Sequence, residues 1–444
     1  MKLWDKGNAT DGLVERFTIG NDAEFDMLLA PFDVLGSIAH VKMLATVGLM
    51  TEDETTVVVG ELRRIYAEIE AGAIRIEPGV EDIHSQIELE LTARLGDVGK
   101  KIHSGRSRND QALTDIKLFL RHALNGIVLE TAALAETLLE LSRKYEPYLL
   151  PGYTHFQVAM PSSFGLWFGA YAESFADDLL ALHGIFSVVN KNPLGSGAGY
   201  GSSFPLNRSM TTALLGFDAL HVNSVYAQMT RGKTEKMVAD GLGNIAATLA
   251  KLAADITLYV SQNFGFISFP DALTTGSSIM PHKKNPDVFE LIRAKCNSIR
   301  SAGTNIAMLT GNLPSGYHRD MQVLKELLFP ALGELSACLQ MMNYAIVNVR
   351  INTGIMHDEK YRFAFSVEDV NRLVVQGVPF RDAYKIVAAS IGDGTFTPDY
   401  NLRHTHEGSI SNTGADSIAR SLREAVATFP FAAIAAAMER LLRD

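Results

Sequence analysis

The sequence predicts a mainly α-helical protein whose centre is a bundle of unusually long helices. Over three stretches, beginning at Leu113, Val238 and Leu328, apolar residues recur at alternating steps of three and four. That spacing is typical of helices that pack lengthwise against one another. Two more stretches, residues 162–190 and 286–312, have a helical pattern that no internal proline interrupts.

The ends of the three periodic runs follow from local signals. The first run continues to Leu141 and stops before Pro147, the second reaches Ile256, and the third reaches Val349. Helices of roughly 25–35 residues would each be about 40–50 Å long. Such rods need a partner along their whole length, so we expect a bundle to which other subunits contribute.

We expect three helical domains, comprising residues 1–107, a central long-helix bundle at 108–356 and a smaller unit at 357–444. Strand signals are sparse, and only segments such as Ala73–Glu77 suggest small hairpins. The glycine-rich segment Pro193–Pro205 lacks the GK[ST] ending of a phosphate loop and follows no predicted strand. We therefore interpret it as a tight connection between helices.

Composition and charge exclude several classes of protein. Of the 444 residues 47% are apolar and 20% charged, which is typical of a globular protein. The net charge of −10 argues against general binding to nucleic acid or to an anionic membrane. No uninterrupted apolar run approaches the roughly 20 residues that cross a bilayer, and no signal-peptide pattern is present. Cys296 and Cys338 fall in predicted helices, which favours a reducing compartment, so we expect a cytoplasmic location.

The densest group of reactive side chains lies in the segment Thr274–Arg293, TTGSSIMPHKKNPDVFELIR. Its first part has no hydrophobic periodicity, which predicts a loop that can move over a bound substrate. Asn285 fits the N-cap of a following helix, Pro286 its first residue and Asp287 its first turn. By spacing alone a surface loop before a capped helix would explain this pattern. The segment also holds two hydroxyls, an imidazole and two ammonium groups within a few residues. This density of reactive groups indicates a functional site.

Two other polar segments could contribute to a site. Leu150–Pro161, LPGYTHFQVAMP, places Thr154 and His155 between prolines. Lys100–Gln111, KKIHSGRSRNDQ, is rich in hydrogen-bond donors directly before the first long helix. Free backbone N–H groups at a helix N-terminus favour carboxylates, so this turn is a candidate anion site. Taken singly, each segment is equally compatible with a capping or structural role.

Together the three segments resemble the signature regions of the fumarase/aspartase superfamily. The sequence GSSIMPHKKNPD at Gly276–Asp287 is similar to that superfamily's signature. Among its families the argininosuccinate lyases are the most similar, and the likeness extends over nearly the whole chain. The similar stretches outside the signature are DVLGSIAHVKML, EDIHSQIE, KIHSGRSRNDQ, LPGYTHFQ, NPLGSGAG, GYHRDMQVLKE and GVPFRDAY.

The resemblance implies a cofactor-free β-elimination without a metal ion, in which argininosuccinate yields fumarate and L-arginine. It assigns proton transfer to Ser277 and His155, stabilisation of the aci-carboxylate to Lys283, and pairing with His155 to Glu290. We expect Ser277 to remove the Cβ proton and His155 to protonate the leaving guanidinium, and the reverse assignment stays open. The implied substrate-binding residues are Ser107, Arg108, Asn109, Thr154 and Asn285, with Tyr317, Gln322 and Lys325 at the arginine end. The resemblance also implies a homotetramer in which several chains share each active site.

Three departures from the family pattern keep alternatives open. The segment Trp4–Asn8 replaces a WGGRF-like start, and Gly20 stands where a small polar residue that contacts substrate is usual. His282 occupies a loop position where this family usually carries glutamine, and the resulting sequence MPHK is also seen in adenylosuccinate lyases. An adenylosuccinate lyase is the nearest alternative enzyme, although no additional basic cluster is available for a nucleotide phosphate. A non-catalytic protein like the δ-crystallins is the alternative from another class, and the presence of Ser277 and His155 weighs against it.

Overall fold

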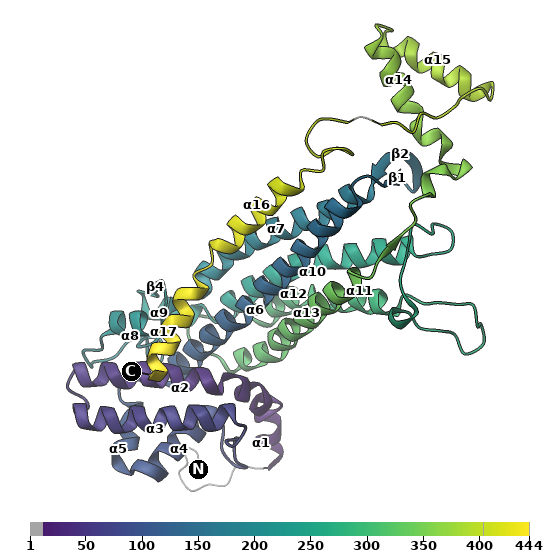
Figure 1. Ribbon diagram of the computed structural model, residues 1–444. Coiled ribbons are helices and arrows are strands. Elements are labelled where there is room, and N and C mark those ends of the chain that lie inside the picture. Colours follow the sequence, from purple (N-terminus) through teal and green to yellow (C-terminus); the bar gives the residue numbers. More distant parts are fainter. Residues whose placement is uncertain (1–11, 403, 444) are drawn as a thin grey trace.

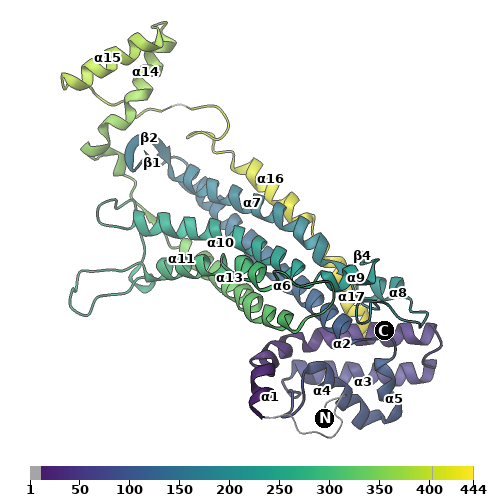
Figure 2. The same ribbon diagram turned by 180° about the vertical axis from the view of Figure 1, so that it is seen from behind.

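The computed structural model describes residues 12–402 and 404–443 of the chain as an elongated, almost entirely helical molecule (Figure 1). The Trp4–Asn8 segment lies outside the described residues. One end is a helical unit that contains α2, and the opposite end carries the hairpin β1–β2 together with α14 and α15 (Figures 1 and 2). Long helices join the two ends, which confirms the predicted fold class.

The central bundle has one continuous hydrophobic core. Leucine, isoleucine and phenylalanine side chains from facing helices fill it, among them Leu124, Phe175 and Leu249, all fully buried. Ser107 caps the longest helix with a capping box, and the helix ends just before Pro147. The bundle helices are α6 (Arg108–Tyr145), α7 (Phe164–Val189), α10 (Lys233–Tyr259), α11 (Asp287–Ile299), α12 (Ala302–Leu309) and α13 (Leu324–Ile346).

One predicted helix is divided in two. The stretch 286–312 was expected to be a single rod, but α11 ends at Ile299 and α12 begins at Ala302. The backbone N–H of Arg300 still bonds to the carbonyl of Cys296, whereas Ser301 bonds to Ser298 in a tighter turn. No proline or glycine marks this position in the sequence, so periodicity alone could not locate the break.

A second core holds the N-terminal unit together. Its helices bury side chains such as Val34, Leu62 and Ile87 against one another. The C-terminal end of the chain joins this core through Leu441, whose carbonyl accepts hydrogen bonds from Arg63 at 3.0 and 3.2 Å. The helices of this unit are α1 (Gly12–Ile19), α2 (Asp22–Thr46), α3 (Glu52–Glu70), α4 (Ile83–Leu95) and α5 (Asp97–Lys100).

Strands are few and short in the described chain. The expected hairpin around Ala73–Glu77 is wrong, because that segment has no regular structure. The only strand pair longer than two residues is instead an antiparallel hairpin after α6. The glycine-rich segment 193–205 connects a two-residue strand to α8 without regular structure. The strands are β1 (Leu149–Thr154), β2 (Gln157–Ser163), β3 (Lys191–Asn192), β4 (Ala219–Leu220), β5 (Ile267–Ser268) and β6 (Arg350–Ile351).

The C-terminal part of the chain occupies two places. After η5 (Glu359–Phe365), helices α14 (Ser366–Val375) and α15 (Phe380–Gly392) extend beyond the hairpin end of the bundle (Figure 1). The chain then returns, so that α16 (Ala415–Ala427) packs along α7 and α17 (Phe431–Arg443) reaches α2. The division into 1–107, 108–356 and 357–444 stays a prediction. The small helices α8 (Arg208–Leu214) and α9 (Ser224–Met229) and the turns η1 (Lys101–His103), η2 (Asp271–Leu273), η3 (Arg319–Val323) and η4 (Ile355–His357) complete the described elements.

Three helical stretches of the described chain could span a membrane, judged by length and apolar composition alone. They are residues 22–46, 108–145 and 415–443. In the first two, 72% and 56% of the most apolar window is buried inside the fold, so packing against neighbouring helices accounts for its composition. In the third the buried share is 22%. That the protein does not act in a membrane stays a prediction.

Candidate active site

The N-terminus of α6 presents the donors expected from the sequence. Ser107 is the N-cap, and its hydroxyl accepts a hydrogen bond from the backbone N–H of Asn109 at 3.3 Å. Asp110 completes the capping box and also accepts bonds from the N–H groups of Gly195 and Gly197, both at 2.9 Å. The buried Asp110 carboxylate thus ties the glycine-rich segment to this helix end. The helix N-terminus is held rigidly, as an anion site requires.

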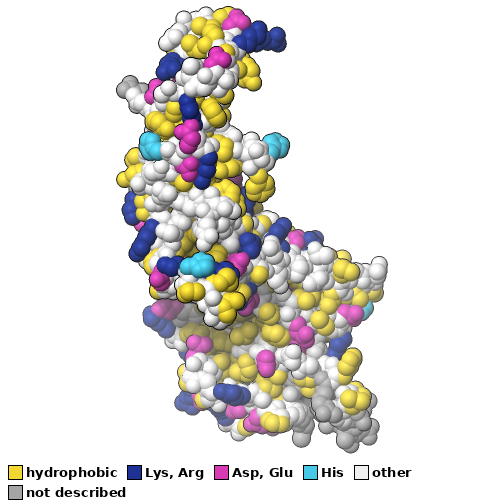
Figure 3. Space-filling view, turned by 90° about the vertical axis from the view of Figure 1, so that its right-hand side faces the viewer, with side chains coloured by type: hydrophobic (Ala, Val, Ile, Leu, Met, Phe, Trp, Pro, Cys, Tyr) yellow, Lys and Arg dark blue, Asp and Glu magenta, His cyan; other side chains and the backbone are white. Residues whose placement is uncertain are grey.

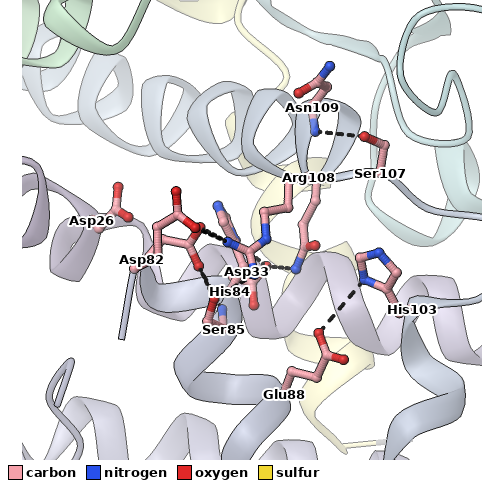
Figure 4. Close-up of polar contacts among 12 residues, drawn as sticks. Asp26, Asp33, Asp82, His84, Ser85, Glu88, His103, Ser107, Arg108 and Asn109 are labelled. Carbon is pink, nitrogen blue, oxygen red and sulfur yellow. Dashed lines mark hydrogen bonds and ion pairs between the residues drawn. The ribbon is translucent and has the colours of Figure 1, made fainter. Parts of the chain in front are cut away.

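Arg108 is held by residues at the N-terminus of α4 and directly before it. Its guanidinium donates to the carboxylate of Asp82 and, at 2.6 Å, to the hydroxyl of Ser85. Glu81 lies 3.5 Å away on the same side. Figure 4 shows Arg108 turned toward Asp82 and Ser85, beside the pair Asp33 and His84. The side chain is therefore positioned by an acidic cradle before any substrate arrives.

Beneath this cradle lies a buried charged network that the sequence did not suggest. The Nδ1 atom of His84 lies 3.0 Å from an oxygen of Asp33 and 3.3 Å from an oxygen of Asp115. Burial opposes ionisation of His84, but the hydrogen bond and charge of Asp33 outweigh it and raise the pKa of His84 to about 9. Contacts with His84, Arg106 and Gln111 hold the pKa of Asp33 at about 2 although burial opposes them. His84 is thus an imidazolium that lines the pocket described next.

The three side chains of this network also offer metal-ligand atoms within 4.8 Å of one another. Oδ2 of Asp33 has no hydrogen-bond partner among the described residues, and Oδ2 of Asp115 has only the 3.3 Å contact with Nδ1 of His84. A charged His84 already compensates the Asp33 carboxylate, and burial, followed by the neighbouring charge of Asp33, raises the pKa of Asp115. The donor set therefore fits a hydrogen-bonded ion pair better than a metal centre.

A cavity of about 200 Å³ opens between the start of α6, η3 and α2. It gathers Arg108 and Asn109 from one signature region with the three residues expected at the arginine end. Lys325, at the start of α13, is buried in its wall, and Tyr317 is half exposed at its side. The amide of Gln322 donates to the carbonyls of Thr18 at 2.8 Å and Ile19 at 3.3 Å. Five predicted substrate-binding residues thus meet within one chain, namely Arg108, Asn109, Tyr317, Gln322 and Lys325.

Four acidic residues line this cavity without having been predicted, Glu81 and Asp82 beside Arg108 and Asp22 and Asp26 beside Lys325. The Nζ atom of Lys325 lies 2.5 Å from carboxylate oxygens of both Asp22 and Asp26. Burial first, and then the neighbouring charge of Asp26, raises the pKa of Asp22. Gly20, considered as a backbone contact, has a φ of 54° and does not line the cavity, whereas Ile19 and Asp22 do. Two carboxylates on one face of α2, four residues apart, were the only signal in the sequence.

Thr154 and His155 lie at the tip of the hairpin β1–β2, which the sequence analysis did not predict. Thr154 pairs with Gln157, so His155 and Phe156 form a two-residue turn. Both have positive φ, 54° and 56°, a conformation that such turns require and that Asn-Gly usually supplies. Non-glycine residues in this region are strained, which is common at functional positions. The tip side chains are exposed and project from the end of the bundle.

The signature loop is pinned at its base and exposed along its length. Thr275 and Asn285 exchange backbone hydrogen bonds at 3.1 and 2.8 Å. The expected N-cap role of Asn285 is wrong, because Pro286 occupies that position and the Asn285 amide donates to the carbonyl of Gly276. The amide therefore ties the loop together instead of capping α11.

Inside the loop the reactive side chains remain accessible. The hydroxyl of Ser277 accepts hydrogen bonds from the N–H groups of Ile279 at 3.3 Å and Met280 at 3.2 Å. Lys283 is exposed, whereas Lys284 forms an ion pair with Asp271. Glu290 is exposed on α11 and lies 3.8 Å from Arg293 rather than against His155. The pairing of Glu290 with His155 is not made within one chain.

The three signature regions are separated within the chain. Arg108 begins α6 and the hairpin follows its end, and a helix of 38 residues is about 57 Å long. Both views show the hairpin and the N-terminus of α6 at opposite ends of the bundle, with the signature loop projecting from its side (Figures 1 and 2). One chain therefore brings together the arginine end and Asn109, but not His155 with them.

The helical fold and this cavity indicate a lyase of the fumarase/aspartase superfamily, and the comparisons with known proteins support that class. A family model described as "Lyase" matches residues 5–301. Argininosuccinate lyases of Parabacteroides distasonis and Bacteroides thetaiotaomicron are 55% and 56% identical over 441 residues, covering 99% of this chain and 99% of each relative. The chain belongs to the argininosuccinate lyase family. An enzyme of that family from Stenotrophomonas maltophilia (strain R551-3) is 39% identical over 90% of this chain and 93% of its own.

Solved structures with lower sequence identity share the fold. An EDDS lyase variant with bound fumarate superposes with a TM-score of 0.76 at 22% identity, covering 98% of this chain and 95% of that chain. A fumarate lyase:delta crystallin from Brucella melitensis gives a TM-score of 0.70 at 17% identity, covering 92% of each chain. The sequence identity to argininosuccinate lyases extends over the full chain, so the adenylosuccinate lyase alternative is rejected. The same identity supports an enzyme rather than a structural crystallin.

Proposed function

We propose that the cavity at the N-terminus of α6 holds argininosuccinate by its arginine end and that chemistry occurs where the other signature regions meet it. The observation that carries this proposal is the convergence of Arg108, Asn109, Tyr317, Gln322 and Lys325 in one cavity of a chain that belongs to the argininosuccinate lyases. No sequence spacing alone would have brought residues 108 and 325 together.

The charges of the cavity suit an α-amino acid. Lys325 is a buried ammonium group that can bind the α-carboxylate, while Asp22 and Asp26 can bind the α-ammonium group. Without substrate the two carboxylates share one lysine. A bound zwitterion brings one further positive and one further negative charge, so each group then has its own partner. Tyr317 and Gln322 border the aliphatic part of the arginine.

The succinyl end is bound by hydrogen-bond donors from three regions. Ser107, Arg108 and Asn109 supply one group at the helix N-terminus, and Thr154 and Asn285 complete it from the hairpin and the loop. Ser277 removes the Cβ proton, and the electron pair of that C–H bond forms the C=C bond of fumarate as the C–N bond breaks. Charge that develops on the neighbouring carboxylate is stabilised by Lys283.

The departing nitrogen receives a proton from His155, whose ring is oriented by Glu290. Ser277 is a weak base in water, so it must act in a closed site beside Lys283, away from solvent. The loop is well placed for such closure, since its ends are pinned by the pair Thr275 and Asn285 while its tip is exposed. In the alternative assignment, His155 removes the Cβ proton and Ser277 protonates the leaving nitrogen. The reaction uses no cofactor and no metal.

The assembly that suits this arrangement is a homotetramer whose active sites combine several chains. The separation of the hairpin from the N-terminus of α6 supports it, as does the apolar surface of the bundle. Helices α11, α12 and α13 expose large apolar side chains, and Figure 3 shows hydrophobic side chains reaching the surface along one face of the molecule. The exposed large apolar residues are Leu291, Met308, Met341 and Tyr344 in these helices and Val347 directly after α13.

The partners we propose are therefore argininosuccinate and its products, fumarate and arginine, together with further copies of the chain. Neither nucleic acid nor a membrane is a proposed partner, in line with the net charge of −10. A biosynthetic lyase with free buried thiols at Cys296 and Cys338 suits the cytoplasm.

A single substitution tests the chemistry. Ser277→Ala should lower kcat by about a hundredfold or more, the range expected for loss of a general base, while substrate binding and thermal unfolding stay unchanged. The rate is followed by the ultraviolet absorbance of fumarate. Ser278→Ala, which removes the adjacent hydroxyl, is the matched control and should retain activity. Near-normal turnover of Ser277→Ala would exclude the proposed base.

A further inference from the structure

A second cavity of the described chain, larger than the one assigned to substrate, lies at the base of the hairpin. It has a volume of about 710 Å³ and opens between the base of the hairpin, the start of α7, the end of α10 and the segment that leads into α16. Aromatic rings form much of its wall, and Trp167 and Tyr259 lie with their ring centroids 5.1 Å apart. Tyr153 of strand β1 and Phe264 add a second pair of rings, with centroids 5.6 Å apart.

Two carboxylates supply the only formal negative charges of this aromatic cavity, Asp255 on α10 and Glu173 on α7. One oxygen of Asp255 accepts hydrogen bonds from the Trp167 indole at 3.0 Å and from the Tyr171 hydroxyl at 2.6 Å. These bonds fix the carboxylate against the wall. Its other oxygen has no hydrogen bond from the described residues.

The cavity lacks positive charge to balance these carboxylates. None of the described residues that line it is a lysine or an arginine, and His155 is the only basic side chain. Burial and the nearby charge of Asp255 raise the pKa of Tyr171 and of Tyr259, so both phenols stay neutral. The cavity therefore combines two negative charges with aromatic faces, and it offers nothing to bind an anion.

We propose that this cavity binds an organic cation that carries no carboxylate, such as an alkylguanidinium or alkylamine. A planar guanidinium can stack on Trp167 and Tyr259 while it donates to the free oxygen of Asp255. An aliphatic stem fits the apolar wall, and a second cationic end reaches Glu173. Free arginine is a poorer ligand, because its α-carboxylate would face two carboxylates without a cation. The occupant would contact the hairpin next to His155, so it would also restrict the turn that carries the proposed acid.

Agmatine, the decarboxylated form of arginine, is the probe that separates this cavity from the active site. Calorimetric titration of the assembled protein should show one agmatine bound per chain. Glu173→Gln and Asp255→Asn should each weaken that binding roughly tenfold, the loss expected when one charge-assisted hydrogen bond is removed. Asp177→Asn is the matched control, because Asp177 is exposed one turn further along α7 and does not line the cavity.

The same titration with Ser277→Ala protein saturated with argininosuccinate should give unchanged agmatine affinity, because Asp255 and Glu173 take no part in binding the substrate, although His155 borders both sites. Agmatine should lower kcat without raising KM for argininosuccinate. The proposal is overturned if wild-type protein binds no agmatine, if Glu173→Gln binds it as tightly as wild type, or if saturating substrate displaces it. Asp255→Asn keeps an acceptor for Trp167, and Glu173 is a surface residue, so the result does not depend on Asp255→Asn folding.

Discussion

At the scale of single residues, the sharing of Lys325 by Asp22 and Asp26 makes a specific prediction about substrate recognition. Asp22→Asn removes one acceptor for the α-ammonium group, so KM for argininosuccinate should rise about tenfold, as expected for one lost charge-assisted hydrogen bond. The rate of fumarate formation at saturating substrate should change little. Steady-state kinetics of purified protein measure both quantities.

A substrate analogue identifies which group Asp22 binds. With an argininosuccinate analogue that has hydrogen in place of the α-amino group, Asp22→Asn and wild type should have similar KM values. Glu24→Gln, an exposed substitution on the same helix, serves as the charge-matched control. An equal effect of Asp22→Asn on both substrates would mean that Asp22 acts only by holding Lys325.

The buried His84 makes a prediction about stability. The pKa of His84 in the folded protein is about 9, above its ordinary value of 6.5. The charged ring therefore stabilises the fold fully below about pH 6.5, and this contribution is lost as the pH rises through about 9. The cost of His84→Gln should be about 3 kcal/mol near pH 6 and close to zero above about pH 9.5.

Denaturant unfolding of both proteins at the two pH values measures this difference. His282→Gln, an exposed histidine substitution in the signature loop, serves as the control variant. The lowered pKa of Asp33, about 2, adds stability above its ordinary value of 3.8 that is lost as the pH falls through about 2. An identical cost of His84→Gln at pH 6 and pH 9.5 would contradict an imidazolium in the folded state.

At the scale of elements, the sequence predicts what depends on periodicity and misses what depends on local backbone geometry. The helices that begin near residues 113, 238 and 328 were predicted because their apolar faces repeat over many turns. The hairpin was missed because its turn is His155-Phe156 instead of a sequence such as Asn-Gly. The break at Arg300 was missed because no glycine or proline marks it.

The candidate site likewise contains residues that the sequence could predict and residues that it could not. Tyr317, Gln322 and Lys325 could be named only through a resemblance, because nothing in their own spacing indicates a pocket. Asp22 and Asp26 were overlooked because two acids on an early helix are usually an exposed face. Their partner, Lys325, is about 300 residues away, and a pattern within one helix cannot reveal a contact of that separation.

The strained turn of the hairpin makes a prediction at this scale. Phe156 has a φ of 56°, which costs an ordinary residue roughly 1–2 kcal/mol and glycine almost nothing. Phe156→Gly should therefore leave thermal stability unchanged or raise it by up to about 1 kcal/mol, part of the gain being offset by the greater freedom of glycine in the unfolded chain. The turnover number should fall several-fold, because a flexible turn holds His155 less firmly.

Phe156→Ala is the matched control, since it removes the same ring but keeps the strained conformation. It should be less stable than Phe156→Gly, and it should lose less turnover. If the two variants had equal stability and equal kcat, the positive φ of this turn would have no role in placing His155.

At the scale of the whole molecule, the length of α6 decides how an active site can be built. A rod of about 57 Å keeps the hairpin away from Asn109 in every conformation of a single chain. Antiparallel packing of two such rods places the hairpin end of one chain beside the α6 N-terminus of another. The exposed apolar side chains of α11–α13 are then covered by neighbouring subunits. We propose that an assembly of several chains and a composite active site both follow from these long helices.

Mixing two inactive variants tests this shared site. His155→Asn and Ser277→Ala should each be inactive alone, but subunits refolded together should recover activity. If each site takes its hairpin from one chain and its loop from another, random mixing leaves about one quarter of the sites with both residues intact. A mixture of Ser277→Ala with Lys283→Met is the control, since both changes lie on one loop and no site regains a complete loop. Light scattering should give the mass of four chains, and a monomeric mass or an inactive first mixture would exclude the composite site.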